Sequence, residues 1–262
     1  MPYPPFTMPG AQPFFARGGS TGVLVMHGFT ATPNEVLWLA QHLAGQGHTV
    51  FAPRLAGHGT DYRDLTRARW QDWVASALDG VAVLRAQCDR VVVSGLSMGG
   101  TLALITASHT AVEGVVALAA PVIVFPGARP SRLRLLKRVR PFSDQTDRSP
   151  FADYVVEQQK LRGDPALGRV RYNIWSTAGV EQLMRLIDAA RTSLPDIAAP
   201  VLAVYSRGDA TVLPHHLDAL KSGLTRARTV EAHLLEHSSH ILTQDTEKES
   251  VFNWVSAFVA NP

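Results

Sequence analysis

The stretch Gly95-Leu96-Ser97-Met98-Gly99 follows a valine-rich run, Arg90 to Ser94, and precedes small residues from Gly99 to about Ser108. The first run is typical of a buried strand and the second of a helix. A Gly-x-Ser-x-Gly pattern at a strand-to-helix junction sets the serine on a cramped turn, where a side chain at either glycine would collide with backbone. Such a turn pushes the Ser97 hydroxyl off the sheet edge, at the positive end of the helix. A plain glycine-rich turn would share these five letters, but not the flanking strand and helix.

On both sides of this turn, short β-branched runs alternate with longer helical patterns. We expect strands at residues 23–26, 48–52, 90–94, 115–119, 201–205 and 229–235, and helices at 35–44, 70–86, 99–108, 215–220 and 248–259. Strands that alternate with helices imply right-handed crossovers and a mostly parallel sheet covered on both faces. The predicted fold class is therefore α/β.

The alternation stops at Pro121 and resumes after Pro195. Between these prolines the chain has helical stretches, Pro and Gly punctuation and no convincing strand. We therefore expect residues 1–120 and 196–262 to form one α/β core, with 121–195 as an inserted helical segment. An insertion of this kind usually lies over the functional edge of a sheet as a lid.

Composition excludes several classes of protein. The 262 residues are 46% hydrophobic and 18% charged, and the formal net charge of +3 gives no reason to expect a nucleic-acid partner. No apolar run approaches the roughly 20 residues that an integral membrane helix needs. Residues 1–13 carry five prolines and no positive run before an apolar stretch, which does not indicate a signal peptide. The single cysteine, Cys88, forms no internal disulfide, so we expect a cytoplasmic protein.

The sequence resembles the α/β-hydrolase superfamily along essentially its full length, and within it the bacterial carboxylesterases and monoacylglycerol lipases. Three stretches carry the resemblance: His27-Gly28-Phe29-Thr30, Gly57-His58-Gly59, and Gly95 to Gly100. It implies a mostly parallel central sheet flanked by helices, with a helical cap inserted after the strand at 115–119. It also implies that His58 shapes its loop.

The resemblance further implies an oxyanion hole for an ester carbonyl. Two backbone N–H donors usually stabilise such an oxyanion, and one comes from the residue after the nucleophile, here Met98. The second is implied to be Phe29, whose neighbour Gly28 allows close backbone approach. The ring of Phe29 could line the acyl pocket as well.

A serine nucleophile needs a base and an orienting acid, which in this superfamily follow it in the order acid and then histidine. His240 and His237 both lie between the last strand and the last helix, and His240 fits the Ser-x-His-apolar pattern better. Asp209 follows the strand at 201–205 and is the expected acid. Asp218 is the alternative acid, within a predicted helix.

Two further groups of residues have a plain and a functional interpretation. The histidines at 215 and 216 and at 233, 237 and 240 match no zinc-ligand spacing, so we expect no metal. Residues 129–140 hold six basic side chains with leucines and Val139 between them. This segment could be a cap helix that makes peripheral contact with lipid, but we favour a solvated face with its leucines packed inward.

We expect a serine hydrolase that cleaves carboxylic esters or monoacylglycerols without a cofactor, through Ser97, His240 and Asp209. The same residues could act on a thioester, amide or peptide. A third interpretation is a weakly catalytic binding protein on the same scaffold. Sequence does not determine acyl-chain length, alcohol preference or oligomeric state.

Overall fold

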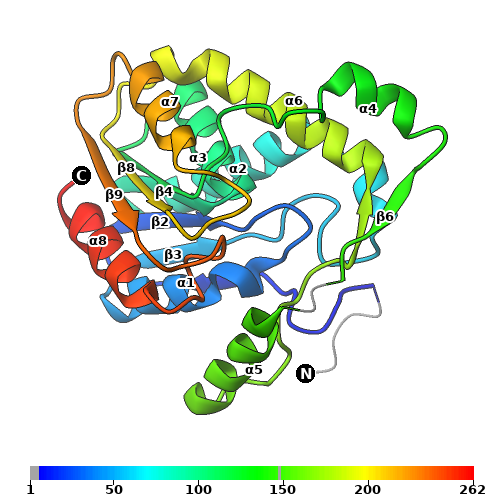
Figure 1. Cartoon of the computed structure of the whole chain (residues 1–262). Coiled ribbons are helices and arrows are strands. Elements are labelled where there is room, and N and C mark those ends of the chain that lie inside the picture. The colour runs from blue at the N-terminus through cyan, green and yellow to red at the C-terminus, as the bar shows by residue number, and fades with distance from the viewer. Residues whose placement is uncertain (1–5, 147–148) are drawn as a thin grey trace.

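A seven-stranded sheet forms the centre of the molecule (Figure 1). The computed structural model describes residues 6–146 and 149–262, so the first five residues of the proline-rich N-terminus lie outside it. The strand order is β1-β3-β2-β4-β5-β8-β9, and every pair is parallel except β1 with β3. The strands are β1 (Phe14–Ala16), β2 (Thr21–Met26), β3 (Thr49–Ala52), β4 (Arg90–Leu96), β5 (Gly114–Leu118), β8 (Val201–Ser206) and β9 (Val230–Leu235). The predicted fold class, a mostly parallel α/β sheet, is confirmed.

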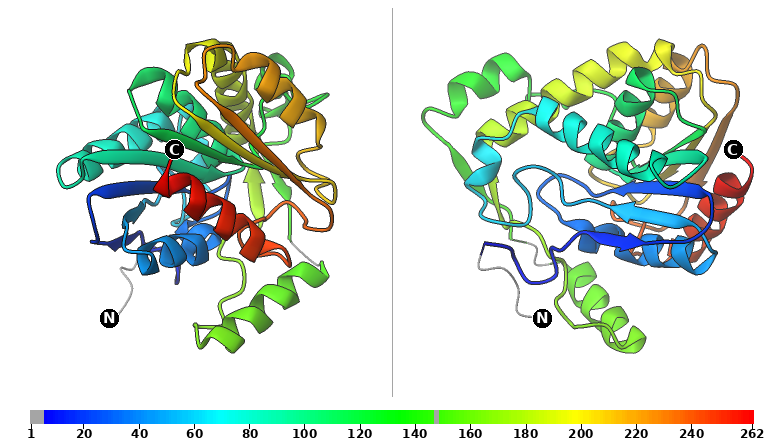
Figure 2. Two further views of the ribbon diagram at one scale, coloured as in Figure 1. Left: turned by 90° about the vertical axis from the view of Figure 1, so that its left-hand side faces the viewer. Right: turned by 180° about the vertical axis from the view of Figure 1, so that it is seen from behind.

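Helices cover both faces of this sheet (Figure 2). On one face lie α1 (Leu37–Gly45) and α8 (Lys248–Ala260), whose apolar residues join those of the strands in one core cluster. On the other lie α2 (Trp70–Arg85), α3 (Met98–His109) and α7 (His215–Gly223), which share the second core cluster. Because the central strands are buried on both faces, they read as continuous apolar runs rather than as alternating ones.

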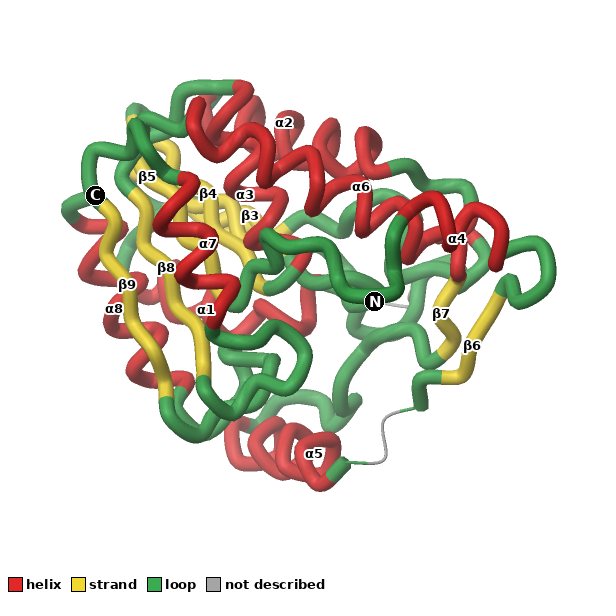
Figure 3. Tube along the Cα trace, turned by 45° about the horizontal axis from the view of Figure 1, so that its top comes forward, coloured by secondary structure: helices red, strands yellow, loops and turns green. Residues whose placement is uncertain are grey.

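The parallel arrangement fixes where the loops meet. Figure 3 shows β9, β8, β5 and β4 side by side across the sheet. Each neighbouring pair among them is parallel, so these strands run in the same direction. The loops after β4, β8 and β9 therefore leave the sheet at the same edge, as do those after β2 and β5. Every strand and helix expected outside 121–195 is present, with the helix expected at 35–44 divided into η1 (Pro33–Val36) and α1. The short helices η2 (Asp64–Thr66) and η3 (Leu194–Asp196) were not expected.

The chain between β5 and β8 holds α4 (Pro130–Leu136), β6 (Phe142–Asp144), α5 (Pro150–Arg162), β7 (Ile174–Ser176) and α6 (Thr177–Ser193). The helix α6 runs over α3, and α4 lies against the end of α6 away from the sheet (Figure 1). The expectation that this part has no strand was wrong, because β6 and β7 pair antiparallel. Each is three residues long and its partner is distant in sequence, so neither shows a strand period.

The strand β1 was also missed. It is a three-residue strand at the edge of the sheet, too short for an alternating pattern to be recognised. Among the described residues, none of the helices combines the length and apolar content required to cross a bilayer.

Candidate active site

Ser97 lies on the turn between β4 and α3 with φ +56° and ψ −120°, a region that side-chain-bearing residues rarely adopt. The turn is as crowded as the sequence predicted. A Cβ on Gly99 would lie 2.1 Å from the Met26 carbonyl oxygen, and one on Gly95 would lie 2.2 Å from the Gly99 carbonyl carbon. The N–H of Ser97 donates to the Leu118 carbonyl at 2.8 Å, which ties the turn to the neighbouring strand.

His240 lies between Ser97 and Asp209. Its Nε2 is 2.8 Å from Ser97 Oγ and its Nδ1 is 2.7 Å from Asp209 Oδ2. The Asp209 side chain is fully buried, and its Oδ1 accepts the backbone N–H groups of Thr211 and Val212. Asp209 thus faces donors on both oxygens, so the proton of the imidazole belongs on Nδ1. Nε2 is then the acceptor for the serine hydroxyl.

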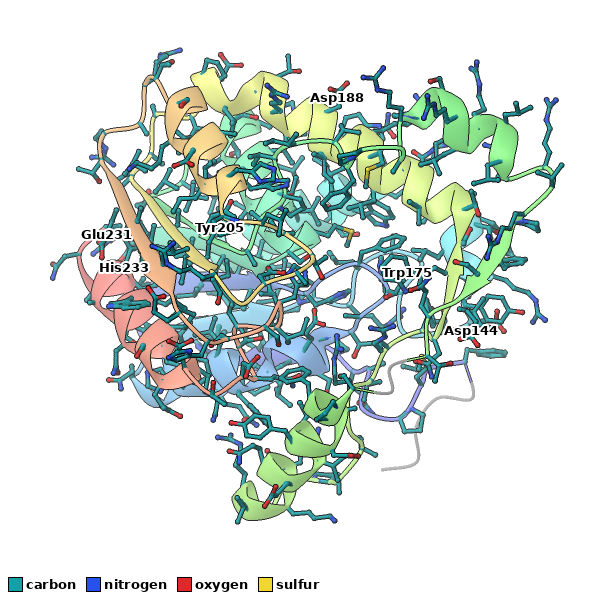
Figure 4. All side chains as sticks on the ribbon, viewed as in Figure 1. Asp144, Trp175, Asp188, Tyr205, Glu231 and His233 are labelled. Carbon is teal, nitrogen blue, oxygen red and sulfur yellow. The ribbon has the colours of Figure 1, made fainter. Side chains whose placement is uncertain are left out.

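The alternative residues lie elsewhere. His237 is exposed, and its backbone N–H donates to Glu247. Asp218 is exposed on α7. His233, on β9, stacks on Trp254 of α8 with ring centroids 4.0 Å apart and also contacts Glu231 (Figure 4). The structure thus brings together Ser97, His240 and Asp209. The alternative residues His237, Asp218 and His233 lie outside this group.

Two carboxylates that the sequence did not single out hold the loop that carries His240. Glu247 accepts hydrogen bonds from the Ser238 hydroxyl and from three consecutive backbone N–H groups, those of residues 236–238. Asp245 accepts the backbone N–H and the hydroxyl of Ser239. Partial burial disfavours ionisation of Glu247, but these hydrogen bonds outweigh it and lower the pKa of the carboxyl. The adjacent His240 is therefore held by an anchored backbone.

The Gly28–Phe29 peptide is held by its carbonyl. Gly28 O accepts from His27 Nδ1 at 2.9 Å and from the Ala31 N–H at 3.3 Å. His27 Nε2 accepts the N–H of Leu55, which fixes the tautomer. Burial, helped by the neighbouring His58, lowers the pKa of His27 well below its usual value, so the ring is neutral. Because the peptide is trans, the Phe29 N–H points away from the anchored carbonyl.

Met98 is the first residue of α3, so its N–H has no carbonyl one turn earlier in the helix to bind. It follows Ser97 directly, at the positive end of the helix. The sequence-predicted donors Phe29 and Met98 therefore lie on the loops after β2 and β4, two neighbouring strands.

The Phe29 ring packs edge-on against His58, Trp73 and Trp175. His58 is fully buried; its Nδ1 donates to the Ala56 carbonyl at 3.0 Å, and burial lowers its pKa to about 4. It does not line the cavity at Ser97.

Ser97 and His240 open into a cavity of about 1190 Å³. The residues that line it form an apolar set and a polar set. Apolar residues come from the loop after β5, from α6 and from the loop of His240: Pro121, Phe125, Val180, Leu183, Met184 and Ile241. Polar residues come mainly from the chain before and after α5 and from the loop after β2: Thr30, Glu35, Asp144, Gln145, Arg169 and Arg171. Trp175 and Asp144 lie close together here on the paired strands β7 and β6 (Figure 4).

In the part of the chain that the structure describes, no three His, Cys, Asp or Glu side chains are grouped so as to hold a metal ion. The site consists of a serine, an imidazole, a carboxylate and backbone N–H groups beside a large cavity.

Comparison with known proteins identifies the family of the chain. The model of the Alpha/beta hydrolase family matches residues 23–252. The chain is 33% identical over 252 residues to a thermostable monoacylglycerol lipase of Bacillus sp. (strain H-257), covering 96% of this chain and 95% of the relative. It is 24% identical to a carboxylesterase of Bacillus subtilis (strain 168), covering 95% and 96%.

Among solved structures, one from work on the metagenome-derived lipolytic enzymes LipS and LipT superposes with a TM-score of 0.82 at 26% identity, covering 98% of this chain and all of that one. The chain therefore belongs to the alpha/beta hydrolase family, and its relatives within that family are lipases and esterases.

Proposed function

We propose that this protein hydrolyses carboxylic esters through Ser97, His240 and Asp209, with the N–H groups of Phe29 and Met98 as the oxyanion hole. The observation that carries the proposal is the continuous line of hydrogen bonds from Ser97 Oγ through His240 to Asp209, at 2.8 and 2.7 Å. This order of donor and acceptor suits removal of a proton from the serine hydroxyl.

In the proposed reaction, Ser97 Oγ attacks the ester carbonyl carbon while His240 Nε2 takes the hydroxyl proton. Asp209 stabilises the imidazolium, and the two N–H groups bind the developing oxyanion. Collapse of the tetrahedral intermediate breaks the bond to the alcohol, which leaves with the proton from His240. Water then attacks the acyl-enzyme by the same steps and releases the carboxylic acid. No cofactor takes part.

We propose a monoacylglycerol or another ester with a short to medium acyl chain as the substrate. An apolar set and a polar set of residues line the same cavity, which suits an ester with an apolar acyl group and a hydroxylated alcohol. A relative at 33% identity is named a monoacylglycerol lipase. We take residues 1–120 and 196–262 as the catalytic core and 121–195 as a cap over it, since α6 and the chain around α5 supply much of the lining.

The test is the Ser97→Ala variant with p-nitrophenyl butyrate. We expect hydrolysis to fall by about 10⁴-fold or more, to what the oxyanion hole and binding alone provide. Ser108→Ala, which removes a serine hydroxyl elsewhere on α3, is the matched control and should keep full activity. A fluorophosphonate should label the native protein and not Ser97→Ala.

Substantial turnover by Ser97→Ala would show that the assignment is wrong. A native protein that neither turns over esters nor reacts with the probe would favour the binding protein instead. Matched ester, thioester and anilide substrates separate the esterase from the thioesterase and amidase alternatives.

We also propose that the cap contacts lipid through α4 and the residues after it. The expectation that the leucines here pack inward holds for Leu133 but not for its neighbours: Leu135 is 69% exposed, Leu136 41% and Val139 81%. Residues 121–143 contain no Asp or Glu. Exposed apolar side chains among cationic ones are typical of a segment that lies at an anionic lipid surface.

Sedimentation with vesicles tests this contact. We expect binding to vesicles that contain anionic phosphatidylglycerol and little binding to pure phosphatidylcholine. The double variant Leu135→Ser/Val139→Ser should lose most of the binding, while Val83→Ser, at an exposed valine of α2, should keep it. Equal absence of binding to both vesicles would remove the proposal.

A lipid-contacting hydrolase with one buried thiol is consistent with the cytoplasm, where we place the protein.

A further inference from the structure

The chain that returns from α5 to β7 runs along the loop after β2. We call residues 169–172 the return segment and residues 27–32 the oxyanion loop. The Tyr172 N–H donates to the Thr30 carbonyl at 2.9 Å, and the Thr32 hydroxyl donates to the Val170 carbonyl at 2.8 Å. Thr30 is buried and has φ +64°, a conformation that is costly for a residue with a branched side chain. The return segment thus holds a strained part of the oxyanion loop in place.

A pair of charged side chains adds a third link. Glu35 Oε2 accepts the N–H of Gly28 at 3.0 Å, and its Oε1 lies 3.5 Å from Nη2 of Arg169. Only 8% of the Glu35 side chain and 14% of the Arg169 side chain are exposed. The guanidinium of Arg169 also lies over the Phe151 ring, 5.5 Å from its centroid. Both partners line the cavity that contains Ser97.

Hydrogen bonds hold the backbone of the oxyanion loop on both sides of the Phe29 N–H. The N–H of Gly28 is held by Glu35, the carbonyl of Gly28 by His27, and the carbonyl of Thr30 by the return segment. The N–H of Phe29 lies between these anchored groups. Its direction therefore depends on contacts that come from both the core and the return segment.

The position of Glu35 has an electrostatic consequence. A Cβ built on Gly28 would lie 2.8 Å from Glu35 Oε2 and 3.4 Å from Ser97 Cβ, so the carboxylate is close to the reacting serine. A buried negative charge here would oppose a developing oxyanion, because charges interact strongly where water is excluded. The guanidinium of Arg169 offsets this charge.

We propose that Glu35 and Arg169 are positioning residues for the oxyanion hole. Glu35 fixes the backbone at Gly28, and Arg169 both holds and neutralises Glu35. The segment inserted between β5 and β8 thereby sets the geometry of catalysis as well as covering the substrate. This inference rests on the proposed ester hydrolysis.

The test is a double-variant cycle of Arg169→Met, Glu35→Gln and both together, assayed with p-nitrophenyl butyrate. Arg169→Met should lower kcat about tenfold with little change in KM, since it leaves the Glu35 charge beside the oxyanion; effects of this size are typical of neighbours that interact. Glu35→Gln should cost less, because a glutamine oxygen still accepts the Gly28 N–H. The double variant should recover most of the kcat lost by Arg169→Met.

Binding of a boronic acid, which forms a tetrahedral anion on serine, gives a second readout. Its affinity should fall in parallel with kcat in Arg169→Met, and Arg169→Lys should restore much of both. Arg162→Met is the matched control: Arg162 joins α5 to Gln41 of α1, away from the oxyanion loop, and its loss should leave kcat unchanged. Equal impairment of Arg169→Met and the double variant would overturn the proposal, as would wild-type kcat and boronic acid affinity in Arg169→Met.

If circular dichroism shows that Arg169→Met does not fold, Glu35→Ala and Glu35→Gln decide. The alanine variant should lose about tenfold in kcat and the glutamine variant little, because only alanine leaves the Gly28 N–H without its acceptor. Equal kcat values in the two would overturn the proposal. Failure of ester hydrolysis itself is recognised separately, by an inactive native protein that the fluorophosphonate does not label.

Discussion

At the scale of the residue, sequence identifies a type of side chain, and the fold decides which copy of it can act. The chain has ten histidines, two of them in the loop before the last helix. Only His240 of that pair lies against Ser97, while His237 faces solvent three residues earlier. The difference comes from the backbone of residues 236–239. Glu247 and Asp245 accept four hydrogen bonds from the backbone N–H and hydroxyl groups of Ser238 and Ser239, and Glu247 accepts two more from the N–H groups of residues 236 and 237.

The two histidines can be separated by substitution. We expect His240→Ala to lower kcat for p-nitrophenyl butyrate by about 10⁴-fold, because the serine hydroxyl then has no base. His237→Ala is the matched control and should retain near-wild-type kcat, since the contact of this residue with Glu247 uses its backbone N–H. Comparable losses in both variants would contradict the assignment of His240 as the base.

Sequence patterns predicted Ser97, Asp209 and His240 because each lies at a fixed place relative to a strand. They did not predict Glu35, Arg169 or Glu247. Each is an acidic or basic residue outside any recognised motif, and such a residue is ordinarily interpreted as a solvated side chain. What distinguishes them is burial next to a particular backbone N–H, and that depends on segments distant in sequence, such as the 134 residues that separate Glu35 from Arg169.

At the scale of the element, the strength of the periodic signal sets what could be predicted. The long amphipathic helix α2 and the buried valine strand β4 have many residues in phase, so α2 was predicted to within one residue and β4 to within two. The strands β1, β6 and β7 have three residues each. A three-residue strand is defined by its partner and not by its own pattern, so it is visible only in the folded chain.

The segment around α4 shows the same limit for burial. The leucines among the basic residues of 129–140 are expected to pack inward, and Leu133 does join the core cluster beside α6. Leu135 points to the opposite side of the helix from Leu133 and is exposed. Leu136 shares the side of Leu133 but is still 41% exposed, because α4 lies at the outer end of α6. Sequence predicted the helix, but which of its leucines are covered depends on where the neighbouring helix ends.

At the scale of the whole molecule, the parallel sheet brings residues from distant parts of the chain to one edge. The loops after β2, β4, β8 and β9 carry Phe29, Ser97, Asp209 and His240. Beneath the oxyanion loop, His27 and His58 are fully buried, with ring centroids 5.1 Å apart. Both are neutral in the folded protein, since burial is the main cause that lowers the pKa of each. Because these two rings must stay neutral while buried, we expect the free energy of unfolding to depend on pH.

The sign of this dependence follows from proton binding. In the folded state the pKa of His58 is about 4, against a usual value of 6.5, so between these pH values the unfolded chain binds more protons. The free energy of unfolding must therefore fall as the pH drops through this window. His58 alone should cost about 2 kcal/mol between pH 7.5 and pH 5, from its shift and roughly 1.4 kcal/mol per unit. His27, and His216 with a pKa of about 4, act in the same direction.

Urea unfolding at pH 7.5 and pH 5 measures the effect. We expect the native protein to lose several kcal/mol over this interval, and His58→Asn, although less stable at pH 7.5, to lose about 2 kcal/mol less. His237→Ala should lose as much as the native protein, because it removes an exposed side chain and leaves the buried imidazoles in place. If His58→Asn does not fold, His216→Asn provides the same comparison. Equal losses in the native protein and the variant would show that the buried imidazole takes up its proton without unfolding, and that neutrality at this position is not a condition of the fold.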